Sequence, residues 1–258
     1  MFPKILIAFG LMFLMSTNAE ALNGREIIDK AHENTSGFQD MSHQVRMILV
    51  DEKGNKSERE MLLKARVNDK GDSSSLSIFT SPQREKGIAL LTNHKVGEGD
   101  EQWIYLPSTR RMKRVTSASR SSSFRGSEFT FEDLSSQNPE DYRFERAADE
   151  ACGELQCYVV DRYPSANLES SYSKTRLWID TTHYRPFKAE YFDKDGKPLK
   201  TMQAFDYRQY DHRFWNPARV VMKNLQTGKA TELVSMDLKI NAGLKESEFT
   251  ELAIRSWH

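Results

Sequence analysis

The sequence predicts a mainly antiparallel β protein with a few helices, an α+β fold in which about eleven strands form a barrel or a strongly curved sheet. Three observations lead to this prediction. Short apolar runs recur at fairly regular spacing along most of the chain. Turn signals such as Asp193-Lys-Asp-Gly196 separate the runs, and helical patterns do not alternate with them. The pattern therefore favours antiparallel pairing of the strands.

Two short segments near the ends of the chain are predicted to be helical. Asn23 is a favourable N-cap with Glu26 three residues later, and Gly37 ends the first segment. The apolar face of this helix consists of Ile27, Ile28 and Ala31. The second segment, residues 246–254, predicts a short closing helix because apolar residues recur there at helical spacing. These residues are Phe249, Leu252 and Ala253.

Strands are predicted for most of the chain between the two helices. A first series covers residues 45–49, 61–67, 76–79, 88–92 and 102–106. After a central interruption, a second series covers residues 142–146, 156–162, 175–180, 187–192, 200–207, 218–224 and 232–240. No fixed-period repeat and no Pro/Gly linker divides this array, so residues 22–258 are predicted to form one domain.

Composition and charge exclude several functional classes. The chain has 37 Lys and Arg against 37 Asp and Glu, and this balance gives no support to nucleic-acid binding, which favours a basic excess. A mean hydropathy of −0.67 excludes a polytopic membrane protein. The 14 Phe supply enough large apolar surface for a core, which argues against a disordered chain. The remaining class is a soluble globular protein.

Residues 1–21 are predicted to be a cleaved signal peptide. Lys4 supplies a positive n-region, residues 5–15 are apolar but too few to span a membrane, and Ala19-Glu20-Ala21 fits a small-x-small cleavage site. The alternative is a retained N-terminal anchor, which the short apolar run disfavours. No Cys follows the cleavage point, so no lipid anchor is expected. We therefore expect a soluble periplasmic protein whose membrane contact is only transient.

The chain has two cysteines, Cys152 and Cys157. In an oxidising compartment, an even pair at this spacing predicts a disulfide across a tight hairpin. The chain-entropy model gives such a small loop about 2 kcal/mol of stabilisation. A redox-active pair is the alternative. It is weaker because the spacing is not Cys-x-x-Cys and no helix N-terminus is evident to lower a thiol pKa.

The central interruption is strongly basic. No acidic residue occurs between Gln102 and Ser127, and Phe residues with interleaved acidic residues follow this stretch. One interpretation is a solvated loop whose aromatic side chains pack into the core. The other is a basic docking face or lid beside an apolar opening, suited to an anionic headgroup or an acidic partner. The basic residues are Arg110, Arg111, Lys113, Arg114, Arg120 and Arg125.

The sequence contains no recognisable catalytic motif. The six His lack metal-ligand spacing, and neither His-Glu-x-x-His nor a Cys/His cluster occurs. A Gly-x-Ser-x-Gly elbow and a phosphate-binding Gly-rich loop are also absent. We therefore predict no enzyme activity, no metal and no cofactor. A periplasmic hydrolase acting on lipids stays open as an alternative, since residues far apart in sequence can assemble a site.

Three neighbouring motifs carry a resemblance to a known family. They are Asp100-Glu-Gln-Trp-Ile-Tyr-Leu-Pro107, Arg111-Met-Lys-Arg-Val115 and Ser123-Phe-Arg-Gly-Ser-Glu-Phe-Thr-Phe-Glu-Asp-Leu134. Further matches are Ser81-Pro82, Lys86-Gly87, Asn224, Thr227-Gly228, Thr231 and Phe249. Over most of the mature chain, the sequence resembles outer-membrane lipoprotein-sorting proteins of the LolA/LolB-like superfamily, in a branch often associated with transporters of the resistance-nodulation-division (RND) type.

The resemblance implies an unclosed antiparallel β-barrel with helices covering an apolar interior. It also implies a carrier that binds lipoprotein acyl chains or another hydrophobic lipid for transfer toward the outer membrane. The alternative is an accessory subunit that docks on an RND-type inner-membrane exporter through the basic segment. The dedicated carrier of the superfamily latches its lid with an arginine, a role that the sequence assigns to no residue here.

Apolar residues of the strands and of the central motif are candidates for lining the interior. Inward-facing side chains recur at every second position of a strand, but alternation alone does not decide which face is inward. The candidates are Met47, Leu49, Leu63, Ile78, Phe79, Leu90, Trp103, Tyr105, Phe124, Phe129 and Phe131.

Overall fold

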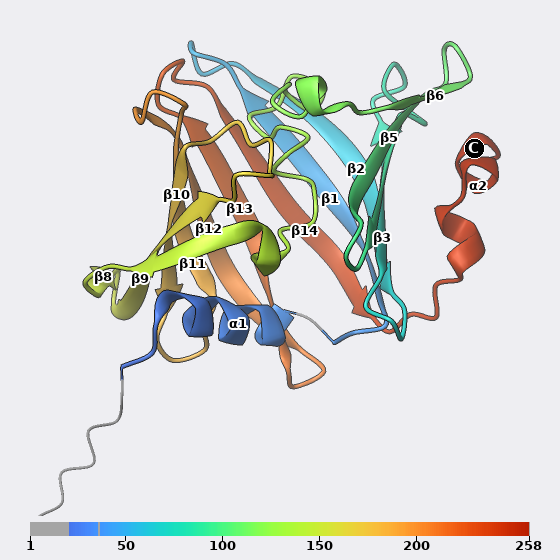
Figure 1. Ribbon diagram of the computed structural model, residues 1–258. Coiled ribbons are helices and arrows are strands. Elements are labelled where there is room, and N and C mark those ends of the chain that lie inside the picture. Colours follow the sequence, from blue (N-terminus) through green and yellow to red (C-terminus); the bar gives the residue numbers. More distant parts are fainter. Residues whose placement is uncertain (1–20, 36, 258) are drawn as a thin grey trace, which may run out of the picture.

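The computed structural model describes residues 21–35 and 37–257, so the predicted signal peptide lies outside the described residues except for Ala21. The strands join one sheet of fourteen strands, which curves into an unclosed barrel (Figure 1). The predicted fold class is confirmed, although the sheet has more strands than the apolar runs indicate. Within the described residues, no helix is both long enough and apolar enough to cross a membrane.

The elements have the following bounds. The helical segments are α1 (Gly24–Thr35), the short 3₁₀ helices η1 (Ser117–Ser119), η2 (Pro139–Asp141) and η3 (Glu246–Phe249), and α2 (Glu251–Arg255). The strands are β1 (Asp40–Val50), β2 (Lys56–Val67), β3 (Ser73–Ser81), β4 (Ala89–Lys95), β5 (Gly99–Leu106), β6 (Arg111–Arg114), β7 (Tyr142–Arg146), β8 (Glu150–Cys152), β9 (Leu155–Pro164), β10 (Lys174–Asp180), β11 (Pro186–Phe192), β12 (Pro198–Tyr210), β13 (Phe214–Asn224) and β14 (Ala230–Ile240).

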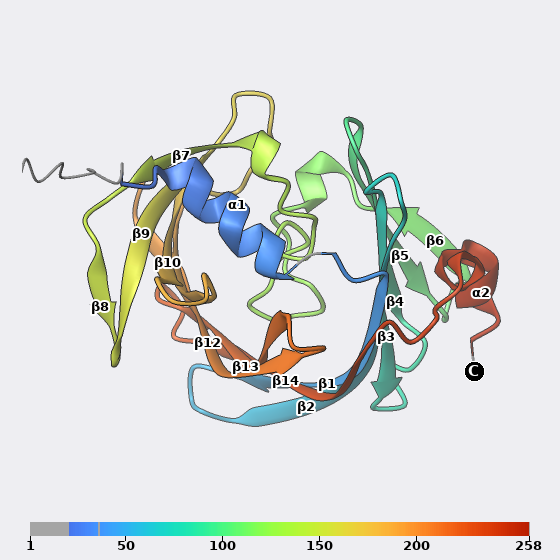
Figure 2. The same cartoon turned by 90° about the horizontal axis from the view of Figure 1, so that it is seen from below.

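The order of the strands explains the shape of the sheet. It runs β6-β5-β4-β3-β2-β1-β14-β13-β12-β11-β10-β9-β7, and β8 pairs with β9 off this path. β1 pairs antiparallel with both β2 and β14, so the first and last strands join the two series near the middle of the sheet. β6 and β7 are its two ends. Since these ends do not pair with each other, the barrel stays open along one side (Figure 2).

Two parts of the chain cover the open, concave side. α1 crosses it next to β7 and β9, whereas a loop between β6 and β7 runs inside the curve of the sheet (Figure 2). We define residues 115–141 of this loop as the central segment. It contains the aromatic and acidic motif on which the family resemblance rests.

α1 begins and packs as the sequence predicts. The Glu26 amide donates to Asn23 Oδ1 at 3.0 Å, and the Glu26 carboxylate accepts from the Asn23 amide at 2.7 Å. This reciprocal cap satisfies two amides at the helix N-terminus. On the buried face, Ile27 and Ala31 pack against side chains of β9 and β10. The helix therefore closes part of the opening with an apolar face.

Of the two predicted terminal helices, α1 covers the opening, whereas the C-terminal segment, residues 241–257, does not. η3 and α2 pack on the outer, convex face of β3–β5 (Figure 2). Phe249 and Ile254 are buried there, whereas Leu252 is exposed. Because the central segment already fills the concave side of these strands, their outer apolar face is the one that the C-terminal segment covers.

Two strands are not predicted from the sequence. β6 is the basic run Arg-Met-Lys-Arg, which lacks apolar alternation, and β8 has three residues. β8 pairs with the start of β9 in a tight hairpin, and the predicted disulfide between Cys152 and Cys157 joins the two strands. The disulfide prediction is confirmed.

Candidate functional site

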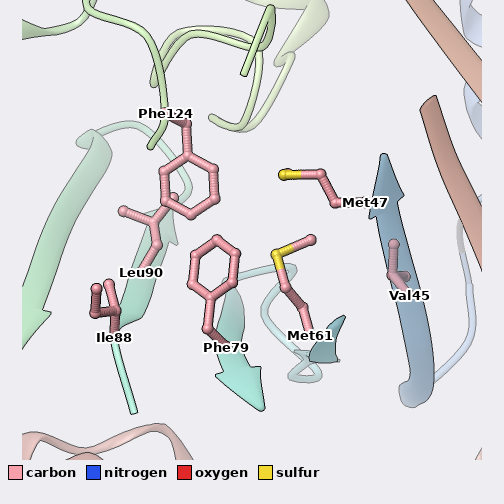
Figure 3. Packing of buried hydrophobic residues seen from close by; sticks show 7 residues of the cluster. All are labelled: Val45, Met47, Met61, Phe79, Ile88, Leu90 and Phe124. Atoms are coloured by element: carbon pink, nitrogen blue, oxygen red, sulfur yellow. The ribbon is translucent and has the colours of Figure 1, made fainter. Parts of the chain in front are cut away.

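The inner face of β1–β5 is apolar because alternate side chains of each strand point into the concavity. On β4, Leu90 points inward, whereas Ala89 and Leu91 point to the outer face. The inner residues form one buried cluster that includes a phenylalanine of the central segment (Figure 3). The cluster consists of Val45, Met47, Met61, Phe79, Ile88, Leu90 and Phe124.

Three phenylalanines of the central segment fill the concavity. Phe124 stacks on Phe79 with the ring centroids 5.6 Å apart, and Phe131 meets Phe124 edge-on at 5.8 Å. Phe129 packs in the other half of the barrel, against side chains of β11 and β13. The central segment therefore occupies apolar space that would otherwise be open on the concave side.

An ion pair with a buried carboxylate ties the central segment to the turn between β3 and β4. Arg125 donates to the Glu85 carboxylate from Nη2 at 2.8 Å and from Nε at 3.1 Å. Arg59 points inward from β2, lies 3.8 Å from the same carboxylate and donates to the backbone carbonyl of Arg125. Burial lowers the pKa of Arg59, and the Glu85 charge opposes this effect. The turn that presents Glu85 contains Pro82 and Gly87, two residues of the family resemblance.

A second ion pair, in which both side chains are buried, ties the central segment to β12. Lys200 Nζ lies 2.5 Å from Asp133 Oδ2, and the two side chains are 3% and 4% exposed. The same ammonium donates to the carbonyl of Glu128 at 3.1 Å. Asp133 also accepts from the Tyr172 hydroxyl at 2.8 Å and from Thr130. Burial, and next the Asp133 charge, raise the pKa of Tyr172, so the phenol stays protonated and donates.

Further hydrogen bonds hold the central segment to β13, β14 and the loop before β10. The Glu128 amide donates to Thr231 Oγ1 at 2.9 Å, and the Glu128 carboxylate accepts from Asn224 Nδ2 at 2.8 Å. The Glu132 carboxylate accepts from the Ser171 amide at 2.6 Å. Asn224 and Thr231 belong to the family resemblance, and their contacts here are with the central segment.

The described residues enclose a larger and a smaller cavity on the concave side. The larger has a volume of about 300 Å³, lies beneath α1 and is lined by β9–β12. Leu177, Ile179 and Met202 form part of its apolar wall, and Glu132 of the central segment lies on its polar side. The smaller cavity, about 170 Å³, lies between β1–β4 and Leu134 of the central segment. The central segment therefore borders both cavities.

The predicted ligand-binding residues divide between the two faces of the sheet. Those on the concave side are Met47, Leu49, Leu63, Phe79, Leu90, Phe124, Phe129 and Phe131. Ile78, Trp103 and Tyr105 instead point to the outer face and pack beneath the C-terminal segment. Strand alternation is the reason: Ile78 precedes the inward Phe79, and Trp103 and Tyr105 flank the inward Ile104. The prediction that these three line the interior is thus corrected.

The predicted docking residues also separate into two groups. Arg120 and Arg125 turn toward the protein, where Arg120 donates to Ser135 Oγ at 3.2 Å and Arg125 pairs with Glu85. Arg125 thus holds the central segment to the sheet, whereas the bond of Arg120 joins two parts of the segment itself. The exposed hairpin of β5 and β6 carries Arg110, Arg111, Lys113 and Arg114.

Sequence reasoning does not identify the polar residues that hold the central segment. Lys200, Arg59 and Glu85 resemble ordinary charges in strands and turns, and the central-segment residues that they contact lie 40 to 72 positions away. The family motif next to them is the one signal that could have directed attention there. Within the described residues, no group of three or more His, Cys, Asp or Glu side chains could hold a metal ion.

Comparisons with known proteins agree with this architecture. A family model described as "Uncharacterized protein" matches residues 71–256. A solved structure named as an outer membrane lipoprotein-sorting protein domain, from Vibrio parahaemolyticus, is 36% identical to this chain. The match covers 90% of this chain and 98% of that one, with a TM-score of 0.86. No curated protein matches the sequence.

Two further structures share the fold at lower identity. A DUF1329 family protein from Desulfovibrio piger is 21% identical, with a TM-score of 0.85 over 90% of this chain and 97% of that one. A LolA superfamily protein from Nitrosomonas europaea is 22% identical, with a TM-score of 0.72 over 89% of this chain and 98% of that one.

Proposed function

Because this chain belongs to the family of outer-membrane lipoprotein-sorting proteins in the LolA/LolB-like superfamily, we propose that it is a periplasmic carrier for lipoprotein acyl chains or another hydrophobic lipid. Cargo binds against the concave face of the half-barrel and is carried toward the outer membrane. One observation supports this most strongly. The apolar concave face is covered by a segment that is not part of the sheet and is held to it by separate polar contacts.

An acyl chain needs such a face because its exposure to water is unfavourable. Each exposed CH₂ group costs about 0.8 kcal/mol, so one long chain costs on the order of 10 kcal/mol. Inward side chains such as Met47, Leu63 and Leu90 provide apolar surface that offsets this cost. A curved sheet supplies that surface along its whole length, since every second side chain points inward.

Loading requires the central segment to move. The larger cavity, at about 300 Å³, is at the lower end of the range for small-molecule sites, which extends to roughly 1,000 Å³. A long acyl chain therefore takes the space that Phe124, Phe129 and Phe131 fill. We assign the latch to Arg125, whose contacts with Glu85 hold the segment in its closed position.

The carrier proposal includes a periplasmic location and no catalytic step. Residues 22–258 act as one exported, soluble domain in the periplasm and contact membranes only while cargo is loaded or released. Transfer of a lipid between two membranes forms and breaks no covalent bond. The protein therefore needs neither a nucleophile nor a cofactor for this task.

Titration of purified residues 22–258 with a fluorescent fatty acid tests the carrier proposal. We expect saturable binding that Met202→Trp weakens about tenfold, because the indole fills the larger cavity. Gln203→Trp is the matched control, since this neighbouring side chain is exposed, and it should bind as the parent does. Native mass spectrometry of protein purified from the periplasm should show a co-purifying lipid. A clean apo mass together with no saturable site would contradict the proposal.

A second candidate function is an accessory subunit that docks on an RND-type exporter. The exposed basic residues of the β5–β6 hairpin favour it, since three of them have no acidic partner among the described residues. Reversal of the charges of Arg110, Arg111 and Lys113 should abolish co-purification of the exporter. Unchanged co-purification would remove the basis of this candidate.

A further inference from the structure

β6 presents a free backbone edge at one end of the sheet (Figure 1). The Val115 amide, directly after β6, donates to the Gln102 carbonyl at 2.8 Å. Hydrogen bonding alternates along an antiparallel pair, so the amides of Lys113 and Arg111 also face β5. The amides and carbonyls of Met112 and Arg114 therefore point away from the sheet. No strand of the described chain pairs with this edge.

The side chains along this edge carry an uncompensated positive charge. Arg110, Arg111 and Lys113 are exposed, and within residues 21–35 and 37–257 none of them forms an ion pair. Arg114 differs, because it donates to Glu101 at 2.8 Å and lies over the Trp103 ring. The free edge therefore combines unused hydrogen-bonding groups with a local excess of positive charge.

The spacing of these charges sets the pattern that a partner must have. Arg111 pairs with Leu106 and Lys113 with Ile104, two residues whose side chains face the concave side. Arg111 and Lys113 therefore lie two positions apart on one face of the sheet. A strand added next to β6 would place every second side chain beside them.

We infer that the β6 edge binds an extended acidic segment of a partner protein by strand addition, with carboxylates at alternate positions facing Arg111 and Lys113. Backbone hydrogen bonds to Met112 and Arg114 supply the attachment, and charge selects the sequence. Charged residues on an edge also prevent pairing between like strands. Here the shared positive sign disfavours a second copy of this chain, whereas an acidic strand satisfies both the backbone and the charge.

The inference goes beyond the carrier function and does not require it, since the edge lies apart from both concave cavities. A peptide probe tests it. The probe is Glu-Val-Glu-Val-Glu-Val-amide with fluorescein attached to its N-terminal amine, titrated into residues 22–258 and followed by fluorescence anisotropy. A peptide with the same composition in blocks, Glu-Glu-Glu-Val-Val-Val, is the pattern control. We expect the alternating peptide to bind about tenfold more tightly than the block peptide.

Two pairs of variants separate strand addition from simple charge attraction. Arg111→Glu with Lys113→Glu should weaken binding of the alternating peptide by more than about tenfold. Lys53→Glu with Lys56→Glu makes the same change of net charge at the exposed β1–β2 turn and should leave binding unchanged. Met112→Pro removes an outward amide without loss of a bond to β5, and Met112→Ala retains that amide. We expect Met112→Pro alone to lose binding.

The outcomes that would overturn the inference differ for strand addition and for its location at β6. Equal binding of the alternating and block peptides, or equal affinities of Met112→Pro and Met112→Ala, would overturn strand addition. Equal effects of the two charge reversals would overturn the location at β6. Circular dichroism of each variant shows whether the sheet is retained. Fatty-acid binding should stay at the parent level in all of them, so that failure here is distinct from failure of the carrier proposal.

Discussion

The inner and outer faces of β3–β5 are both covered by segments outside the sheet, but the two covers are held differently. Each cover buries an aromatic anchor, Phe124 on the inner face and Phe249 on the outer face. The inner cover is held by Glu85, which is buried although its partner Arg125 is 34% exposed, and on the far side by the Lys200–Asp133 pair, in which both side chains are buried. On the outer face, the Glu248 side chain is 32% exposed where it pairs with Lys64.

This difference indicates different tasks for the two covers. Buried ion pairs fix one geometry, but their net contribution to stability is small because desolvation offsets the attraction. Such pairs fix the position of the cover on the sheet, and their small net contribution to stability lets the cover leave the sheet. The outer cover relies on apolar contact, which contributes through buried area and does not depend on a single geometry. We therefore regard the central segment as a movable cover and the C-terminal segment as a permanent one.

Removal of the cation from the buried Lys200–Asp133 pair should destabilise the protein most. Lys200→Met leaves the Asp133 carboxylate buried without its cation, so the free energy of unfolding should fall by about 3–5 kcal/mol. The control is Lys188→Met, which removes the partly exposed pair with Glu190 and should cost less than about 1 kcal/mol. Urea unfolding measures both. Equal losses in the free energy of unfolding would show that burial does not set the effect of removing the cation.

A second experiment compares the two aromatic anchors. Phe124→Ala and Phe249→Ala should each destabilise the protein by about 3–5 kcal/mol, because both remove a buried ring. Only Phe124→Ala should also increase binding of a fluorescent fatty acid, since it opens space on the concave side. If Phe249→Ala increased binding as much, the assignment of cargo to the inner face would be wrong.

The stability of the protein at low pH tests the burial of His43, which lies on the inner side of β1. Burial lowers the pKa of this imidazole to about 4, and its Nδ1 lies 2.6 Å from Ser235 Oγ. The unfolded chain takes up this proton near pH 6.5, so a stabilising term present above that pH is lost as the pH falls toward 4. It amounts to about 3 kcal/mol. Between pH 7.5 and pH 4.5, the free energy of unfolding measured in urea should fall less for His43→Gln than for the parent. Equal falls would contradict the inference that buried His43 stays neutral in the folded protein.

The smallest expected effect concerns the outer cover. The hydrogen bond from Lys64 holds the pKa of Glu248 below its usual range, but water screens this partly exposed pair. Glu248→Gln should therefore change the free energy of unfolding by less than about 1 kcal/mol. Urea unfolding provides the measurement. A loss as large as that of Lys200→Met would mean that charge holds both covers alike.

The sequence predicts the fold better than it predicts the site. Apolar runs and turn residues reveal strands directly, whereas β6 is hidden because its residues are mostly basic. Ile78 and Phe79 are equally apolar neighbours, and only the packing of the two covers decides which one faces inward. The Lys200–Asp133 pair joins residues 67 positions apart, and no local pattern encodes such a contact. The capping box at Asn23 depends on a spacing of three residues and could be predicted.

Hydrogen exchange measured by mass spectrometry, with and without a fatty acid, shows whether cargo displaces the central segment from the concave face. We expect cargo to lower the protection of residues 120–136, since the central segment leaves the concave face, while residues 246–255 of the outer cover keep theirs. Saturable fatty-acid binding with unchanged protection of residues 120–136 would contradict this expectation, because cargo would then bind without moving the central segment.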